Sequence, residues 1–518
     1  MMTLNSEKDN ISGLPDSWLI QKDRTACYYH VPADQFTGIV TTLKALESRL
    51  VSIIGEEGFY VPDLCSISYV FELLDTPRYL VLVLTCPEPE SITGLFPAAS
   101  FFERKISDGF GVRFSGSGDE RRLFLHEPYP EGFHPMKKGY VNTPVVAAGT
   151  PCPFPFREMK GESVYHIPVG PVHAGIIEPG HFRFSVIGET IMNLEVRLGY
   201  LHRGIEKLME GKDPDEGVTL AESISGDESA VNACGYALAV EQICMITVPE
   251  RAEYIRGIIL ELERSYSLVS DLAGMVTDIG FPVAASRLLV LREELQRACD
   301  SLTGSRFLKG IIRIGGVSRD FSSDSLLILD SLAEETGKRL EEIVSWISSV
   351  PSVIDRFSTT GVIRETLIDP LALSGPVARA SGRVLDVRVD HPYGIYRDQI
   401  ISPVSERAGD VLARFNLKSE EILVSLNFIR QLVSGIPTGP VRCAIAMHDG
   451  FALAGIESPR GRTIHYVRIR DSRIERYFVA TASFSNWQAI EHAVMGNIVP
   501  DFPLINKSLN LSYSGTDV

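Results

Sequence analysis

The residues best suited to redox or metal chemistry in this sequence are its eight cysteines, and their spacing argues against such a role. No two of them form a C-x-x-C pair, the close spacing that structural zinc and iron–sulfur sites usually need. We therefore interpret them as buried thiols in a reducing compartment. They are Cys27, Cys65, Cys86, Cys152, Cys234, Cys244, Cys299 and Cys443.

Other ligand-binding signals are also missing. The sequence has neither a G-x-G-x-x-G after an expected strand nor a G-x-x-x-x-G-K-[ST], so no nucleotide site of those types is predicted. The formal net charge of -16 repels a phosphate backbone and an anionic membrane surface, which argues against nucleic-acid partners and free membrane attachment. No run of about 18 apolar residues predicts a membrane span, and Met1–Asn10 is not typical of an export signal. We expect a cytoplasmic chain.

Hydrophobic patterns divide the chain into three parts. Residues 35–54 have apolar side chains at helical spacing and predict an amphipathic helix, and Tyr79–Cys86 is an apolar, β-branched run typical of a buried strand. Residues 101–140 change from a helical pattern to turns rich in Gly and Pro. We predict a small α/β domain over residues 1–140. Residues 141–163 are then expected to form an extended linker, or to run along the surface of a partner.

The third part, residues 164–518, is expected to be mainly helical. Residues 182–198 predict a hairpin turning near Gly188, and a helix is expected to begin near Tyr200. Short strands are expected from Phe451 onward. The fold class is therefore α+β: the small α/β domain, then a helical bundle domain with peripheral β-hairpins. Long helical patterns cover 252–275, 284–301, 323–349 and 405–434.

Three separate blocks carry a resemblance to a known family. They are GPVHAGIIEPGHFRFSVIGETIMNLEVRLGYLHRGIEKLMEG (Gly170–Gly211), SGPVARASGRVLDVRVDHPYGIY (Ser374–Tyr396) and IESPRGRTIHYVRI (Ile456–Ile469). Together they resemble the large subunit of the energy-converting, group 4 (formate hydrogenlyase-type) nickel–iron hydrogenases. They are more distantly similar to the complex I subunit beneath the quinone chamber. The resemblance implies a hydrogenase large-subunit-like domain from residue 164 to residue 518.

The N-terminal unit carries a resemblance of its own. ERKISDGFGVRF (residues 103–114) and RRLFLHEPYPEGFHPMKKGY (residues 121–140) look like the small complex I subunit that flanks the large one. Formate hydrogenlyase-type large subunits carry that module fused at the N-terminus, which is the order found here.

The chain departs from the hydrogenase pattern at the metal ligands. The resemblance places the two C-x-x-C pairs of hydrogenases at Ser225 and Glu228 and at Ser512 and Gly515. A soft, redox-active nickel–iron centre needs thiolates, which none of these residues supplies. We therefore expect no metal or other cofactor in this chain, and no hydrogenase activity from it alone. The carboxylates of Glu228 and Asp517 would suit a hard cation such as magnesium, unless basic residues neutralise them.

The complex I resemblance is incomplete in the same way. A tyrosine and a histidine are implicated there in holding the quinone headgroup. His181 matches the histidine, but the tyrosine position falls on Gly226, which has no phenol to donate a proton. This difference argues against quinone reduction of the complex I kind.

The resemblance implies that polar residues gather where the metal would be. These are Glu178, His181, Asp227, Glu228 and Asp517, and Glu178 matches a glutamate that passes protons in hydrogenases. Carboxyl groups close together in a partly buried cleft raise one another's pKa and can share protons, which predicts a proton-handling pocket. The alternative is a degenerate cavity filled with hydrogen-bonded side chains and water.

Four other polar residues lie in the matched blocks. Arg379 and Arg388 could pair with the carboxylates of the vacated centre or be solvated charges, and we favour pairing because both lie in a matched block. His173 and His202 are interpreted as histidines that each make one backbone hydrogen bond, the commonest role for a lone histidine.

The resemblance predicts a subunit of a membrane-attached respiratory or energy-converting redox complex. Its expected partners are a small subunit that carries an iron–sulfur cluster, a membrane anchor and antiporter-like subunits. The expected location is the inner face of the cell membrane, reached through those partners. The vacated site could handle protons, or reduce a quinone or another small acceptor. The alternative is a non-catalytic scaffold that transmits conformational change.

Overall fold

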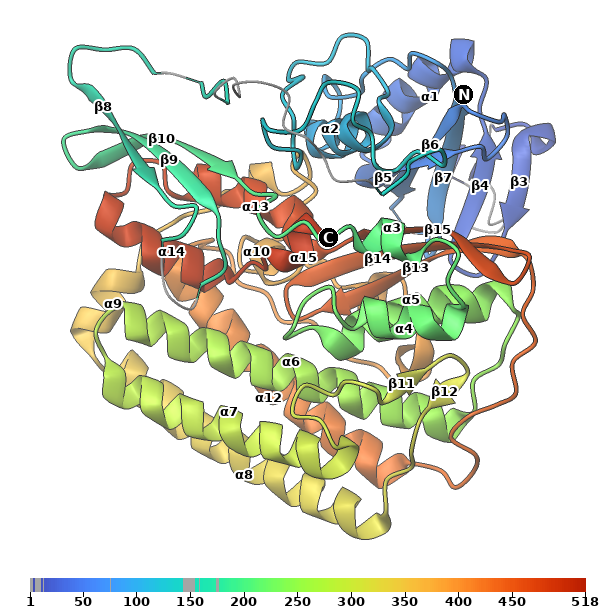
Figure 1. Cartoon of the computed structure of the whole chain (residues 1–518). Helices are drawn as coiled ribbons and strands as arrows, with labels where there is room; N and C mark the ends of the chain where they lie inside the picture. Colours follow the sequence, from blue (N-terminus) through green and yellow to red (C-terminus); the bar gives the residue numbers. More distant parts are fainter. Residues whose placement is uncertain are drawn as a thin grey trace.

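The structure is a computed structural model that describes residues 3–4, 11–12, 14–74, 76–142, 154–157, 159–173 and 177–518. Much of the predicted linker, residues 143–153 and residue 158, lies outside the described residues, as does Cys152. The described parts form an N-terminal unit seated on a larger, mainly helical unit (Figure 1). The mixture of helices and strands confirms the predicted α+β class.

The N-terminal unit is built on a five-stranded sheet in the order β3-β4-β7-β6-β5. Neighbouring strands are antiparallel except β4 and β7, which are parallel. The predicted strand at Tyr79 is confirmed as β7. Two helices, α1 and α2, pack on the sheet. The bounds are β3 Leu19–Lys22, β4 Ala26–His30, α1 Ala33–Ala45, β5 Arg49–Glu57, β6 Cys65–Glu72, β7 Tyr79–Thr85 and α2 Ala99–Phe110, with a short pair β1 Thr3–Leu4 and β2 Ile11–Ser12 and a 3-10 turn η1 Asp16–Trp18 before them.

The helix predicted over residues 35–54 is confirmed only as far as Ala45 and is wrong beyond it. Helix α1 ends at Ala45, the chain turns through Glu47 with a φ of 55°, and residues 49–57 form β5. Most of β5 is buried, so its apolar residues form a nearly continuous run. Such a run cannot be told from a continuing helix by periodicity alone.

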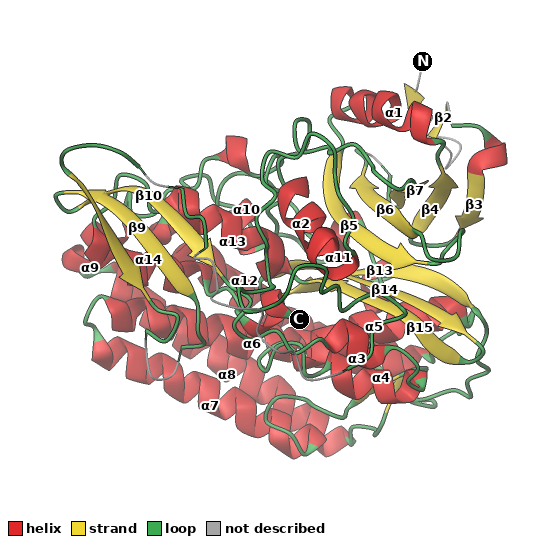
Figure 2. Ribbon diagram, turned by 45° about the horizontal axis from the view of Figure 1, so that its top comes forward, coloured by secondary structure: helices red, strands yellow, loops and turns green. Residues whose placement is uncertain are grey.

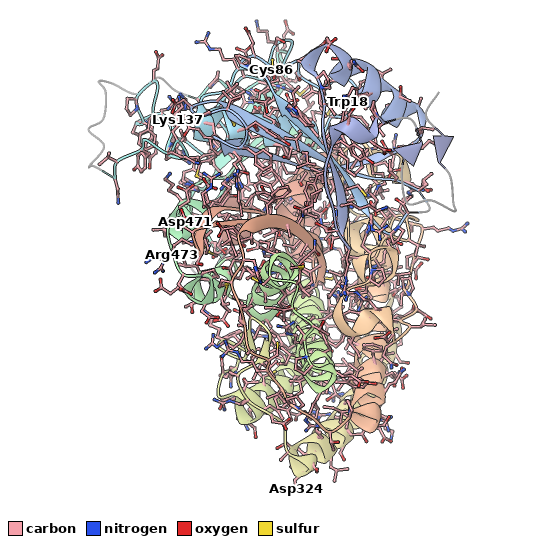
Figure 3. All side chains as sticks on the ribbon, turned by 90° about the vertical axis from the view of Figure 1, so that its right-hand side faces the viewer. Trp18, Cys86, Lys137, Asp324, Asp471 and Arg473 are labelled. Carbon is pink, nitrogen blue, oxygen red and sulfur yellow. The ribbon has the colours of Figure 1, made fainter. Side chains whose placement is uncertain are left out.

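The helical unit is centred on four long helices that pack as a bundle. Helix α6 (Glu250–Asp278) contacts α7 (Pro282–Thr303) and α12 (Val411–Gly435), and α8 (Ser323–Ser348) contacts α7 and α12. The side-chain oxygens of Ser322 and Asp410 cap the first turns of α8 and α12. All four predicted helices are confirmed. Seen from the side, Asp324 at the start of α8 lies at the opposite end of the molecule from Trp18 and Cys86 of the N-terminal unit (Figure 3).

An antiparallel sheet of β13 (Gly450–Ser458), β14 (Gly461–Arg470) and β15 (Arg473–Ala480) joins the two units (Figure 2). One part of it, including Leu453, Tyr466 and Phe478, belongs to the N-terminal core, and another part, including Ile456 and Val467, belongs to the core of the helical unit. The strands predicted after Phe451 are thus present. Helices α13 (Ala482–Ala493), α14 (Phe502–Leu509) and α15 (Ser514–Asp517) follow them and were not predicted.

The remaining elements are short. The predicted hairpin at Gly188 is confirmed as β9 and β10, with β8 as a third strand. The helix expected near Tyr200 begins only at Ile205, because residues 199–204 are held in a turn against the C-terminal tail. The bounds are β8 Val164–Val169, β9 His181–Ile187, β10 Thr190–Arg197, α3 Ile205–Met209, α4 Pro214–Ala221, α5 Ser229–Ile243, β11 Ile312–Arg313, β12 Gly316–Val317, α9 Pro351–Phe357, η2 Glu365–Leu367, α10 Pro376–Arg379, α11 Val387–Asp390, η3 Gly394–Arg397 and η4 Val499–Asp501.

A candidate proton-handling site

The loop before α5 and the C-terminal tail meet inside the helical unit. Ser225 Oγ lies 3.0 Å from Ser512 Oγ, and Ser512 Oγ accepts a hydrogen bond from the Gly515 N–H at 2.9 Å. A Cβ atom built on Gly515 would lie 3.0 Å from Ser512 Oγ and 3.6 Å from Ser225 Cβ. Three of the four positions assigned to metal ligands are therefore in mutual contact. Glu228, the fourth, is buried at the start of α5.

Arg460 lies between the two acidic residues of this loop. It comes from the turn that joins β13 to β14. Its guanidinium donates to both oxygens of Asp227, at 3.1 and 2.6 Å, and approaches Glu228 Oε2 at 2.9 Å. Ser225 Oγ donates to Asp227 Oδ1 at 2.9 Å. Arg460 lies in the third matched block but was not among the predicted site residues.

Arg460 affects the two carboxyl groups differently. Burial acts to raise the pKa of Asp227, but the adjacent guanidinium outweighs it and holds that pKa at about 2. Burial, helped by the Asp227 charge, raises the pKa of Glu228 despite the same guanidinium. Of the two, Glu228 is therefore the carboxyl group better able to hold a proton.

The expectation that Arg379 and Arg388 neutralise these carboxylates is wrong. Both arginines are buried in a separate ionic cluster between α6, α10, α11, α12 and β13. Their partners are Glu421 at 2.6 Å and Glu457 at 2.8 Å for Arg379, and Asp386 at 2.6 Å and Glu261 at 3.0 Å for Arg388.

Two further predicted carboxylates, Glu178 and Asp517, connect the C-terminal tail to earlier parts of the chain. Glu178 Oε2 accepts the Ser514 N–H at 3.0 Å, and the Asp517 carboxylate accepts the N–H groups of Gly199 and Leu201, each at 2.8 Å. Burial, with a smaller contribution from the Glu178 charge, raises the pKa of Asp517 to about 6. This carboxyl group can therefore exchange a proton near neutral pH.

The histidines lie at the margin of the site. His181 Nδ1 is 3.3 Å from the Gly170 carbonyl, and burial lowers the pKa of this imidazole. His173 and His202 each have a backbone carbonyl partner, as interpreted from the sequence: Pro171 for the first and Asp517 for the second. The structure thus brings His202 to the tail beside Asp517, whereas the hydrogen bond of His181 points to the loop before it.

Glu263 is a buried carboxyl group that the sequence analysis missed. It lies in α6 and accepts the N–H groups of Ala230 and Val231, each at 2.8 Å, which caps the start of α5. Burial raises the pKa of Glu263 to about 8, and the Glu228 and Asp227 charges add to that rise. One signal was available: Glu263 follows Ile259 by four residues and precedes Tyr266 by three, so it interrupts the apolar face of the helix.

The donor set does not fit a nickel–iron centre. Two hydroxyl groups that hydrogen-bond to each other, a glycine and a carboxylate paired with Arg460 replace the four thiolates, and the guanidinium adds a positive charge beside them. Among the described residues, no group of three or more His, Cys, Asp or Glu side chains is arranged to hold a metal ion.

We therefore expect no stoichiometric nickel in this chain when it is purified from cells that make active hydrogenases. Hydroxyl and carboxylate oxygens are poor ligands for a soft metal, and a guanidinium repels a cation. Elemental analysis of the purified chain measures this directly, with an active hydrogenase from the same cells as the positive control. One nickel per chain would contradict the assignment of Ser225, Glu228, Ser512 and Gly515 to the ligand positions.

Two family models match this chain. The family model described as the respiratory-chain NADH dehydrogenase 49 kDa subunit matches residues 278–449, and the model described as the 30 kDa subunit matches residues 29–145. The chain therefore belongs to the family of large subunits shared by complex I and the energy-converting hydrogenases, with the 30 kDa-type module at its N-terminus.

Individual relatives come from several kinds of complex. Formate hydrogenlyase subunit 5 of Escherichia coli K12 is 33% identical over 83% of this chain and 77% of that protein. A subunit of the F(420)H(2) dehydrogenase of Methanosarcina mazei is 31% identical over 69% of this chain and 98% of that protein. A chain of the membrane-bound sulfane sulfur reductase, an archaeal respiratory membrane complex, superposes with a TM-score of 0.64 at 26% identity, covering 69% of this chain and 99% of that one. In the described part of our chain, no helix is long and apolar enough to cross a bilayer.

Proposed function

We propose that this chain is a subunit of a membrane-attached redox complex and that its vacated metal centre holds protons. The observation that carries this proposal is the cluster of Asp227, Arg460 and Glu228 beside the paired hydroxyls of Ser225 and Ser512. Glu228, Glu263 and Asp517 all have raised pKa values there. Such groups can take up and release protons while electrons move on a neighbouring subunit.

The proposed partners follow from the relatives, which include subunits of membrane-bound hydrogenase, NADH-quinone oxidoreductase and F(420)H(2) dehydrogenase. They are an iron–sulfur small subunit, a membrane anchor and antiporter-like subunits, with this chain on the cytoplasmic face. The iron–sulfur cluster belongs to the partner. Affinity purification from native membranes tests the assembly, since a chain that emerges alone, without an iron–sulfur partner, would exclude it.

A second candidate function is a non-catalytic scaffold. The observation in its favour is that Arg460 already pairs with both Asp227 and Glu228, so each carboxyl group has a protein partner without a substrate. Against it, Gly226 is exposed and the neighbouring Asp227 side chain is 39% exposed, so this carboxylate is accessible to a small molecule from outside.

Turnover by the intact complex separates the two functions. With reductant and an acceptor, we expect Asp227→Asn with Glu228→Gln to lower turnover about 100-fold or more if these groups supply protons to the reaction. The matched control is Asp324→Asn with Glu341→Gln, the same chemical change on the exposed surface of α8. Assembly is checked for each variant by the yield of the purified complex. Unchanged turnover in an assembled double variant would favour the scaffold.

A further inference from the structure

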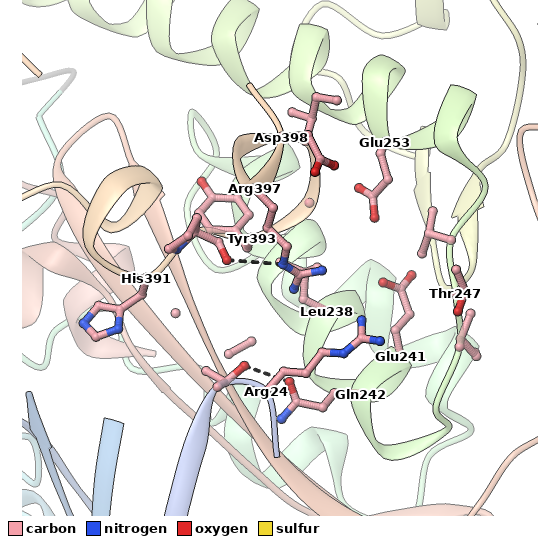
Figure 4. Close-up of a pocket in the computed structure, with 18 of the residues that line it drawn as sticks. Arg24, Leu238, Glu241, Gln242, Thr247, Glu253, His391, Tyr393, Arg397 and Asp398 are labelled. Atoms are coloured by element: carbon pink, nitrogen blue, oxygen red, sulfur yellow. Dashed lines mark hydrogen bonds between the residues drawn. The ribbon is translucent and has the colours of Figure 1, made fainter. Parts of the chain in front are cut away.

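A large cavity, about 760 Å³, lies at the far end of α5 from the proton-handling site. Helix α5 has 15 residues, so its two ends are separated by roughly 22 Å. The cavity is enclosed by the turn between β3 and β4, the C-terminal end of α5, the first turns of α6 and residues 391–399 (Figure 4). It therefore lies at the junction of the N-terminal and helical units, a common place for small-molecule sites.

Groups of opposite charge line this cavity without pairing with one another. The Glu253 carboxylate, half-buried in α6, accepts no hydrogen bond and has no ion-pair partner within 4 Å among the described residues, although the charges of Arg256 and Arg397 act on it from farther away. Arg24 and Arg397 lie exposed in turns and also have no carboxylate partner in the described part of the chain; Arg397 Nε reaches only the Pro392 carbonyl, at 3.3 Å. Figure 4 shows the side chains of Glu253, Arg24 and Arg397 around the same space.

The neighbouring Glu241, in contrast, has partners for both of its carboxylate oxygens. It also lines the cavity, but it binds the buried Arg256 through both oxygens, at 2.5 and 3.1 Å, and accepts the Gly315 N–H at 2.7 Å. Glu241 therefore has a structural role. Glu253 has no comparable partner among the described residues, although burial raises its pKa and so disfavours its charged form.

Two further residues shape the space beside Glu253. Gln242 lines the cavity, where its Oε1 accepts from Thr25 Oγ1 at 2.8 Å and its side chain also hydrogen-bonds to Asp23. A Cβ atom at Gly394 would lie 2.9 Å from Glu253 Oε2, so only glycine keeps the space in front of this carboxylate open.

We propose that this cavity binds a small zwitterion, with a protonated amine against Glu253 and a carboxylate or phosphate against Arg24 and Arg397. Guanidinium groups pair with both kinds of anion through charge-assisted hydrogen bonds. The cavity volume is within the range of pockets that enclose small organic ligands. A ligand with both charges would satisfy groups that the protein leaves unpaired.

Calorimetric titration of the full-length chain tests the proposal. The probes are the twenty amino acids and phosphoethanolamine, so the two arms distinguish a carboxylate from a phosphate. We expect saturable binding of at least one probe, weakened tenfold or more by Glu253→Gln and by Arg24→Gln. Glu341→Gln and Arg113→Gln make the same changes at exposed positions outside the cavity and should leave binding unchanged. Putrescine and acetate, which carry only one kind of charge, should bind at least tenfold more weakly than the best zwitterion.

Thermal unfolding without ligand shows whether each variant is folded. Arg397→Gln provides a second test at an exposed position if Glu253→Gln lowers the Tm by itself. The proposal is overturned if no probe binds, if putrescine or acetate binds as tightly as the best zwitterion, or if binding survives in the folded cavity variants. None of these results depends on the redox function, because the cavity shares no residue with the proton-handling site.

Discussion

Replacing Arg460 with methionine is expected to destabilise the loop before α5 and the C-terminal tail by about 3–5 kcal/mol. Methionine keeps much of the side-chain volume but removes the positive charge. Glu228, which is 2% exposed, would then be a buried carboxyl group without its cation, and Asp227 would lose both of its guanidinium hydrogen bonds. Hydrogen exchange at the amides of α5 measures the loss locally, which is preferable to one global unfolding midpoint in a chain of 518 residues.

Two further variants make this result specific. Arg430→Met removes an arginine from a half-exposed ion pair with Asp330 on the bundle surface and should cost less than about 1 kcal/mol. Adding Asp227→Asn and Glu228→Gln to Arg460→Met removes the unpaired charges, so protection should return in part. If Arg460→Met is no more harmful than Arg430→Met, the guanidinium does not hold the site together.

The sequence predicted the helical unit better than it predicted the site. The helices α6, α7, α8 and α12 are long, and each has one apolar face that repeats at 3.6 residues, a signal that needs no tertiary information. The end of α1 was missed because the buried strand β5 continues the apolar pattern beyond Ala45. Local patterns thus located helices well and failed where a strand is buried on both faces.

The prediction of the site depended on the resemblance, because contacts between distant parts of the chain leave no local pattern. Ser225 and Ser512 are 287 residues apart, and no local pattern places them together. The resemblance gave their positions, but it could not say which cation replaces the metal. Arg379, Arg388 and Arg460 all lie in matched blocks, and only the path of the turn between β13 and β14 brings Arg460 to the site. Its role could therefore not be deduced from sequence.

Glu263 is expected to make the stability of the protein fall as pH rises from about 5 to about 8. Burial raises the pKa of this carboxyl group from its ordinary 4.5 to about 8. Over that interval the folded chain keeps a proton that the unfolded chain releases, so unfolding becomes more favourable with each increase in pH. A single such group contributes at most about 1.4 kcal/mol per pH unit. Below about pH 4.5 its contribution is fully present, and above about pH 8 it is lost.

The variant Glu263→Gln isolates this contribution from other titrating groups. Asp517, with a pKa of about 6, acts in the same direction, while His202, whose pKa burial lowers, acts in the opposite one. Both remain in the variant, so they cancel when its pH dependence is subtracted from that of the wild type. Glutamine also leaves one N–H of α5 without an acceptor, a cost that does not change with pH. The expected result is a smaller loss of local stability between pH 5 and pH 8 in the variant, measured by hydrogen exchange at α5.

The same comparison tests whether the site stores a proton. A neutral Glu263 means that one proton is held at neutral pH on a buried carboxyl group whose pKa the Glu228 and Asp227 charges help to raise. If wild type and Glu263→Gln have the same pH dependence, Glu263 is ionised in the folded protein and stores no proton. The site would then hold two charged carboxylates, Asp227 and Glu263, against the single guanidinium of Arg460, a costly arrangement for a buried Glu263 unless a further cation is bound there. The same pH dependence in wild type and Glu263→Gln would therefore exclude proton storage at Glu263 and favour a bound cation.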